Sequence, residues 1–312
     1  MSGDGADESF ATVDGVELAY ALVSHVARSR GIRTLMVKGP MAAEDGLRAP
    51  RVVADADVLV EPGQFETLYQ LIRDRGWHPR VARESPRFLA WHSRTLIHDS
   101  WPCDIDMHRY FPGFFGDPDR VFKALWAGRR VRGDVGASAV IPSRAGMAVI
   151  VALHALRSPE ADRSQREIES VARALSERFS ASEREEFVDI ARAGRASWVL
   201  RDLIAAAGLG PVEDDARPEE KTLWQQNQMS TTEKSAALWL GAVLSHPLRR
   251  IPQAALHAVW VPRREIPRND ASLLPSVRET LAFQLARWRR GIAALRGRDG
   301  RRTALDAAGD IT

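Results

Sequence analysis

The spacing of apolar residues in the first half of the chain alternates between the period of a helix and that of a strand. Apolar residues three to four positions apart predict helices over 14–31 and 62–77. Short apolar runs predict buried strands over 34–38 and 54–60. Two extended runs flank Asp-Ser-Trp-Pro and predict a hairpin over 94–111. Helices and strands therefore alternate in this half.

From about residue 143 onward the pattern is helical. Runs such as RAGMAVIVALHALR and REIESVARALSERF repeat with the helical period, and further helices are predicted over about 232–245 and 275–296. We therefore predict an α+β fold, with a small mixed sheet and flanking helices followed by an all-helical C-terminal half. The predicted divisions are a disordered lead (1–13), an α/β domain (14–142), a helical domain (143–297) and a flexible tail (298–312).

The amino-acid composition excludes several classes of protein. Hydrophobic residues make up 45% and charged residues 27%, as in ordinary globular proteins. No apolar run approaches the ~20 residues of a membrane span, and the acidic N-terminus has no apolar signal core. The single cysteine, Cys103, excludes an internal disulfide and a cysteine-based zinc site. A cytoplasmic protein without a membrane partner is expected.

The net charge of the chain indicates which kinds of partner it can bind. The formal charge is +3 and the excess of basic residues is spread along the chain. Proteins that bind long nucleic acids usually gather basic residues on one face. The weak, dispersed excess therefore argues against long nucleic acid as a partner.

Two aspartates occupy the second predicted strand. Side chains alternate across a strand, so Asp55 and Asp57 point to the same face. Like charges about 6–7 Å apart repel one another and resist burial. A cation between them removes this cost, and carboxylate oxygens suit Mg²⁺. The pair therefore predicts a magnesium site.

A third carboxylate is expected from the hairpin. Its second strand carries Asp104, Asp106 and His108, again on one face. One aspartate beside the first pair would give a triad able to hold two divalent ions about 3.5–4 Å apart. Asp104 and Asp106 are alternatives for this position. His108 by itself is also explained as a structural histidine.

The part of such a site that binds the nucleotide phosphates, called the phosphate end below, needs positive charge and a backbone that can come close to the phosphates. Lys38 and Gly39 lie between a predicted strand and a predicted helix start, which favours an anion. Arg51, four residues before Asp55, has the planar fork that clamps a phosphate. The alternatives are a plain turn at Lys38-Gly39, and a structural ion pair between Arg51 and the Asp55/Asp57 pair.

Taken in order, these motifs resemble the uncharacterised nucleotidyltransferase family of the polymerase-β-like superfamily. The matching segments are MVKG, RVVADADVLV, IDMH and the Leu153-His154-Ala155 segment. The resemblance extends to about residue 280 and is strongest over 34–108. The chain departs from the wider superfamily at Gly39-Pro40, where a serine contact to phosphate is lost. It departs from the family at Ser170, where members tend to have an aspartate.

The resemblance implies the roles of the site residues. Asp55 and Asp57 would hold both metal ions, and Asp106 would bind one ion and accept the proton of the attacking hydroxyl. Asp104 is the rival of Asp106, but only Asp106 has the Asp-x-His context. His108 and His154 would contact the nucleotide or the acceptor, although His154 is equally well explained as a core histidine.

The expected activity is nucleotidyl transfer. An NTP such as ATP, with two Mg²⁺ ions, would donate its nucleoside monophosphate to an unidentified acceptor and release pyrophosphate. A small molecule, a peptide or a protein is favoured as the acceptor. The alternative is a degenerate nucleotidyltransferase fold that senses nucleotides or binds a partner without turnover.

Overall fold

The computed structural model describes residues 4–80, 92–133, 139–228, 260, 261, 263, 266 and 274–289. The chain divides into two compact units, Met1–Pro79 with Trp91–Lys221, and Arg80–Ala90 with Thr222–Thr312. The predicted boundary at residue 143 falls inside the first unit, so the division into an α/β domain and a helical domain stays a prediction. The helix predicted over 232–245 and the tail over 298–312 lie outside the described residues.

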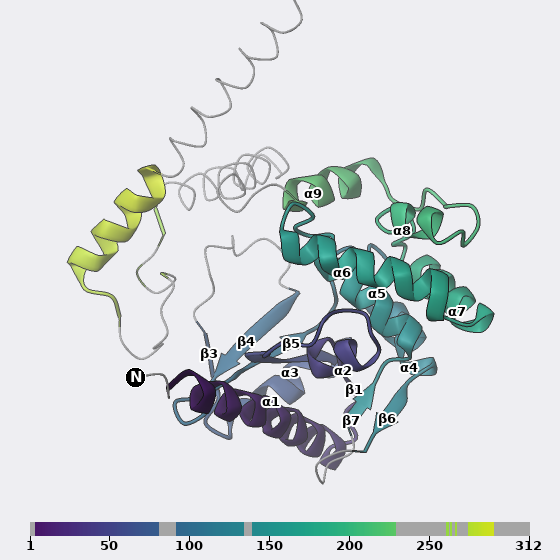
Figure 1. Cartoon of the computed structure of the whole chain (residues 1–312). Coiled ribbons are helices and arrows are strands. Elements are labelled where there is room, and N and C mark those ends of the chain that lie inside the picture. Colours follow the sequence, from purple (N-terminus) through teal and green to yellow (C-terminus); the bar gives the residue numbers. More distant parts are fainter. Residues whose placement is uncertain are drawn as a thin grey trace, which may run out of the picture. The chain divides into compact units, whose positions relative to one another are not determined.

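A mixed sheet forms the centre of the first unit (Figure 1). Within the described residues it has the strand order β1-β2-β5-β4-β3. The pair β2/β5 is parallel, while β1/β2, β4/β5 and β3/β4 are antiparallel. This confirms the small mixed sheet and the hairpin predicted from the sequence. The strands are β1 (Thr34–Met36), β2 (Asp55–Val60), β3 (His78–Pro79), β4 (Ser93–Ile97) and β5 (Asp104–His108).

Helix α1 (Asp4–Ser29) packs against β1, β2 and α3. It begins at Asp4, within the stretch predicted as a disordered lead, and acidic residues in its first turns suit a helix N-terminus. Leu18 is exposed. The helix buries a stripe with helical spacing that consists of Val16, Ala19, Tyr20, Val23, Val26 and Ala27.

The connections of the sheet carry further helices. Helix α3 buries one amphipathic face, as predicted, with Phe65, Leu68 and Ile72 inside. A small two-stranded sheet, β6 and β7, follows α4. These elements are α2 (Gly39–Glu44), η1 (Pro62–Gln64), α3 (Phe65–Arg73), α4 (Pro118–Ala127), β6 (Arg130–Arg132) and β7 (Ala139–Ile141).

The described residues after β7 contain helices and no strand, which confirms the all-helical second half. Ser143 caps α5, and Ser180 forms a capping box with Glu183 at the start of α7. Helix α5 is buried on nearly every side between α6 and α7. The elements are α5 (Arg144–Ala155), α6 (Asp162–Arg173), η2 (Ala174–Arg178), α7 (Ala181–Ala193), α8 (Arg201–Ala206) and α9 (Pro218–Gln228).

The second unit contains a helix over 277–289, within the range predicted for the last helix. Gln284 is fully buried, and its amide binds both the backbone N–H and the carbonyl of Val261. Among the described residues, no helix has both the length and the apolar character needed to span a membrane.

Candidate functional site

Two neighbouring parallel strands carry the acidic residues predicted from the sequence. In the register of β2 and β5, Asp55 lies opposite Asp104, and Asp57 lies opposite Asp106. Because side chains alternate along a strand, all four carboxylates rise from one face of the sheet. The other face is apolar and fully buried, with Ala56, Val58, Ile105 and Met107. The register therefore brings the two Asp-x-Asp segments directly side by side.

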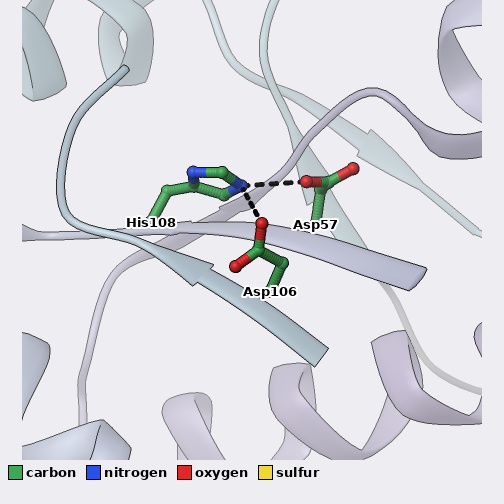
Figure 2. Close-up of side chains that lie close together, drawn as sticks. All are labelled: Asp57, Asp106 and His108. Carbon is green, nitrogen blue, oxygen red and sulfur yellow. Dashed lines mark hydrogen bonds and ion pairs between the residues drawn. The ribbon is translucent and has the colours of Figure 1, made fainter. Parts of the chain in front are cut away.

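Three predicted site residues meet at one point, namely Asp57, Asp106 and His108 (Figure 2). The Nε2 atom of His108 lies 2.8 Å from Oδ1 of Asp57 and 3.3 Å from Oδ2 of Asp106. Thr95, on β4, donates its hydroxyl proton to Oδ1 of Asp106 at 3.3 Å. The imidazole thus bridges carboxylates from adjacent strands, and a hydroxyl from a third strand holds one of them.

The turn before α2 brings a lysine to the same carboxylate. The Nζ atom of Lys38 lies 2.5 Å from Oδ1 of Asp57, and both side chains are buried. Lys38 has a φ of 57° and Gly39 a φ of 46°, both in the left-handed region that favours glycine. The lysine therefore holds a strained backbone conformation, which is typical of functional positions. Lys38 therefore brings a positive charge directly to Asp57.

Tyr20 supports this turn from α1. Its hydroxyl accepts a hydrogen bond from the backbone N–H of Asp57 at 3.2 Å and donates one to the carbonyl of Val37 at 3.4 Å. A Cβ atom built on Gly39 would lie 2.5 Å from the same hydroxyl oxygen. Glycine is therefore required at position 39 both by its φ and by the close approach of Tyr20.

The charges of the cluster stabilise one another. Burial by itself would raise the pKa of Asp57, but Lys38 and His108 outweigh it and hold the pKa below its ordinary value. The pKa of Asp106 is likewise held below its ordinary value, because His108 outweighs the effect of burial. For His108, burial would lower the pKa, yet Asp106 and Asp57 raise it above the ordinary value. Both carboxylates are therefore ionised at neutral pH.

Asp55 lies in a different electrostatic environment. Burial raises its pKa, and the neighbouring charge of Asp57 raises it further. Lys38 opposes this shift without overcoming it. Asp55 lies outside the group of converging ligand atoms formed by Asp57, Asp106 and His108. Asp104, its neighbour across the strands, also lies outside that group.

Two further histidines lie near the cluster. His154, on α5, is within electrostatic range of Lys38 and Asp57, and burial lowers its pKa to about 3. His92, next to β4, has its ring centroid 6.3 Å from that of His108, and burial and then Arg157 lower its pKa to about 3. Both imidazoles are therefore neutral at physiological pH. A contact of His154 with the nucleotide or the acceptor stays a prediction.

Arg51 pairs with a residue that the sequence alone did not connect to it. Its Nη2 atom lies 3.9 Å from Oε1 of Glu167, on α6. An ion pair of Arg51 with Asp55 or Asp57, the structural alternative considered from the sequence, is not found among the described residues. Arg48 also faces Glu167, and it donates a hydrogen bond to the carbonyl of Gly39.

Sequence reasoning missed Tyr20, His92, Thr95 and Arg48, because they come from elements outside the recognised motifs. One signal was present for Arg48, since it precedes Arg51 by three residues in the same connection. Tyr20 and Thr95 gave no signal in the sequence, because only tertiary packing and strand register bring them to the aspartates.

The donor set fits a divalent cation. Two carboxylate oxygens and one imidazole nitrogen, from Asp57, Asp106 and His108, lie within 4.8 Å of one another. Carboxylates suit Mg²⁺ and Mn²⁺, and imidazole suits transition metals. Nδ1 of His108 is buried and has no hydrogen-bond partner among the described residues. The group can therefore bind a cation through atoms that already point toward one another.

Comparison with known proteins adds little to this geometry. No protein-family model matches the chain, and no curated protein matches it. One solved structure to which the chain is similar is an antigenic nucleotidyltransferase-like protein from Paracoccidioides brasiliensis. The identity is 9% and the TM-score 0.36, over 62% of this chain and 94% of that chain. At these values the chemistry of the site has to be argued from its own residues.

Proposed function

We propose that this protein transfers a nucleoside monophosphate from an NTP to a hydroxyl or similar group of an acceptor. The acceptor oxygen would attack the α-phosphorus, the bond from that phosphorus to the bridging oxygen would break, and pyrophosphate would leave. The observation that supports this reaction best is the convergence of Asp57 and Asp106 from parallel strands, with Lys38 beside them. The motif order described above supplies the reaction class.

Asp57 and Asp106 are proposed as metal ligands, with Asp55 completing the set for a second Mg²⁺. Both are ionised at neutral pH, so their oxygens are available to a cation. When bound, two such ions would stabilise the negative charge on the attacking and leaving oxygens. Asp106 is also proposed to accept the proton of the attacking hydroxyl. His108 would orient both carboxylates through the contacts described above.

Lys38, Gly39 and Arg51 are proposed for the leaving phosphates. The turn presents the ammonium of Lys38 next to Asp57, where a phosphate bound between metal and lysine would lie. Tyr20 packs so closely against Gly39 that this turn has no room for a Cβ atom at position 39. Charge that builds on the leaving oxygens would then be met by a positioned cation, which lowers the barrier.

His154 and the helical second half would line the acceptor pocket, and a small molecule, a peptide or a protein is favoured over long nucleic acid as the acceptor. Cytoplasmic location is proposed from the sequence alone.

The test is label transfer. The protein would be incubated with α-³²P-labelled NTPs, Mg²⁺ and a cell extract of the host, followed by separation of labelled products and assay of pyrophosphate. We expect a labelled product with the wild type and none with Asp57→Asn or with EDTA. Label transfer that persists in Asp57→Asn would contradict the proposal.

A second candidate is a nucleotide-binding module without turnover. The observation in its favour is that Asp57 and Asp106 already have partners within the chain, namely Lys38, His108 and Thr95. Such a module would bind Mg-NTP, measured by calorimetry, and would release no pyrophosphate with any acceptor.

A further inference from the structure

Three arginines face a single carboxylate beside the turn before α2. Arg48 and Arg51 come from the connection between α2 and β2, while Arg163 and Glu167 lie on α6. All three guanidinium groups face the same oxygen, Oε1 of Glu167, at 3.9, 3.9 and 3.3 Å. Residues more than a hundred positions apart thus form one charged cluster, called the arginine cluster below.

The cluster carries an excess of positive charge. Three guanidinium groups and one carboxylate give a formal charge of 3 − 1 = +2. No second carboxylate forms an ion pair with Arg48, Arg51 or Arg163 among the described residues. Burial lowers the pKa values of Arg48 and Arg51, and repulsion from the neighbouring arginines lowers them further. An anion bound here would relieve this repulsion.

Hydrogen-bond donors in the cluster are also incompletely used. A guanidinium has five N–H groups, and a separation of 3.9 Å is too long for a hydrogen bond. Glu167 therefore attracts Arg48 and Arg51 electrostatically but forms no hydrogen bond with either. Nε of Arg48 is buried without a hydrogen-bond partner within the described part of the chain. Buried donors of this kind call for an explanation, and a bound ion is one.

The cluster has a buried base and an exposed rim. The side chains of Arg48 and Glu167 are 4% and 7% exposed, whereas those of Arg51 and Arg163 are 32% and 54% exposed. Arg48 also donates to the carbonyl of Gly39, so the base is attached to the turn that directs Lys38 toward Asp57. The exposed arginines of the rim are therefore connected, through Arg48, to this turn.

We propose that Arg48, Arg51 and Arg163 form a binding site for a polyphosphate, the terminal phosphates of the donor nucleotide, with Glu167 as a carboxylate that competes with the phosphates for the arginines. This rests on the proposed function and extends it, since it adds Arg48, Arg163 and Glu167 to the phosphate end. Arginine forks match phosphate oxygens two at a time. A group with two or more negative charges neutralises the excess of the cluster, and the terminal phosphates of an NTP meet this condition.

The probe is inorganic tripolyphosphate, titrated by calorimetry in EDTA so that binding does not depend on a metal ion. Arg163→Gln changes a half-exposed side chain and should weaken binding about tenfold, the loss expected for a charge-assisted contact. Arg192→Gln, on α7, is the matched control. Arg192 has a similar exposure of 45% and pairs with Asp189 and Glu213, so its loss removes the same charge away from the cluster.

Glu167→Gln separates a ligand site from a structural ion-pair network. In a ligand site, removing the competing carboxylate raises the charge of the cluster and tightens tripolyphosphate binding. In a purely structural network the same change loosens the arginines and weakens binding. Weaker binding in Glu167→Gln, equal losses in Arg163→Gln and Arg192→Gln, or no binding by the wild type would each overturn the inference.

The label-transfer assay keeps this inference separate from the proposed function. Tripolyphosphate binding that depends on Arg163, without label transfer to any acceptor, would support the cluster and count against the enzyme. Label transfer by the wild type, together with a tripolyphosphate affinity that is unchanged in Arg163→Gln, would support the proposed enzyme and count against the arginine cluster as a phosphate site.

Discussion

Nζ of Lys38 lies 2.5 Å from Oδ1 of Asp57, and the two side chains are only 8% and 4% exposed. A buried ion pair is costly to desolvate and needs additional polar contacts to be stable. His108 provides one, at 2.8 Å from the same oxygen. One carboxylate oxygen of Asp57 thus contacts both Lys38 and His108, and Lys38 lies beside the carboxylate that is proposed to bind a metal ion.

The first prediction concerns Lys38 and the free energy of unfolding. Lys38→Met leaves Asp57 buried with one partner fewer, and we expect a loss of ~3–5 kcal/mol, the usual cost of breaking a buried pair. Urea denaturation at pH 7 measures it. Lys123→Met, at an exposed position of α4, is the control and should change stability by less than ~0.5 kcal/mol. A loss below ~1 kcal/mol in Lys38→Met would show that the pair is not a structural contact.

Asp55 and Asp57 are predicted to affect stability with opposite signs. The pKa of Asp55 is raised by burial and by Asp57, so its ionisation costs stability as the pH rises through that pKa. Asp55→Asn should therefore unfold at higher temperature than the wild type at pH 7 in EDTA, and the gain should vanish below the ordinary carboxyl pKa of about 3.9.

The pKa of Asp57 is lowered, chiefly because Lys38 outweighs the effect of burial. Its stabilisation is present above the ordinary pKa and is lost as the pH falls, so Asp57→Asn should melt at lower temperature at pH 7. From the sequence alone, relief of repulsion was expected for both aspartates, and the structure restricts it to Asp55. Scanning calorimetry from pH 3 to 8 gives both results, and a gain in both variants would contradict the arrangement.

The third prediction concerns Gly39 and Tyr20. Gly39→Ala forces a side chain into a left-handed conformation, at a cost of ~1–2 kcal/mol. It also places a Cβ atom at 2.5 Å from the hydroxyl oxygen of Tyr20. Tyr20→Phe removes that oxygen, so the cost of Gly39→Ala should be smaller in the Tyr20→Phe background. A double-mutant cycle of unfolding free energies measures this coupling, and strict additivity would refute the close approach.

The fourth prediction distinguishes the two aspartates of β5. Asp106 shares a cluster with Asp57 and His108, whereas Asp104 lies opposite Asp55. Asp106→Asn should reduce label transfer by roughly 10–100-fold or more, the loss expected when a metal ligand or a residue that supports one is removed. Asp104→Asn removes the same charge from the same strand and should retain most of the rate. Equal losses would make Asp104 the third carboxylate or would place both in the site.

Local patterns predicted the elements that carry the site, and tertiary pairing decided how they meet. Alternation predicted that Asp55 and Asp57 share a face and that Asp104 and Asp106 do so on another strand. It could not give the parallel register that sets Asp57 beside Asp106. That register depends on which strands become neighbours, and alternation within one strand carries no information about this.

The inner face of α1 also depends on tertiary packing. Leu18 and Tyr20 both belong to stripes with helical spacing, and only packing against the sheet decides that Tyr20 faces inward. Arg51 and Glu167 lie more than a hundred residues apart, so no periodic pattern connects them. The predictable part was therefore local, and the contacts between distant segments needed the structure.

The most direct test is the binding of divalent ions at Asp57 and Asp106 in the presence of nucleotide. Mn²⁺ replaces Mg²⁺ at carboxylate sites and can be counted by electron paramagnetic resonance. With a non-hydrolysable NTP analogue, we expect the wild type and Asp104→Asn to bind two Mn²⁺ ions per chain, and Asp106→Asn and Asp57→Asn to bind fewer and more weakly. Unchanged Mn²⁺ binding in Asp57→Asn and Asp106→Asn would contradict the assignment of this cluster as a metal-dependent nucleotide site.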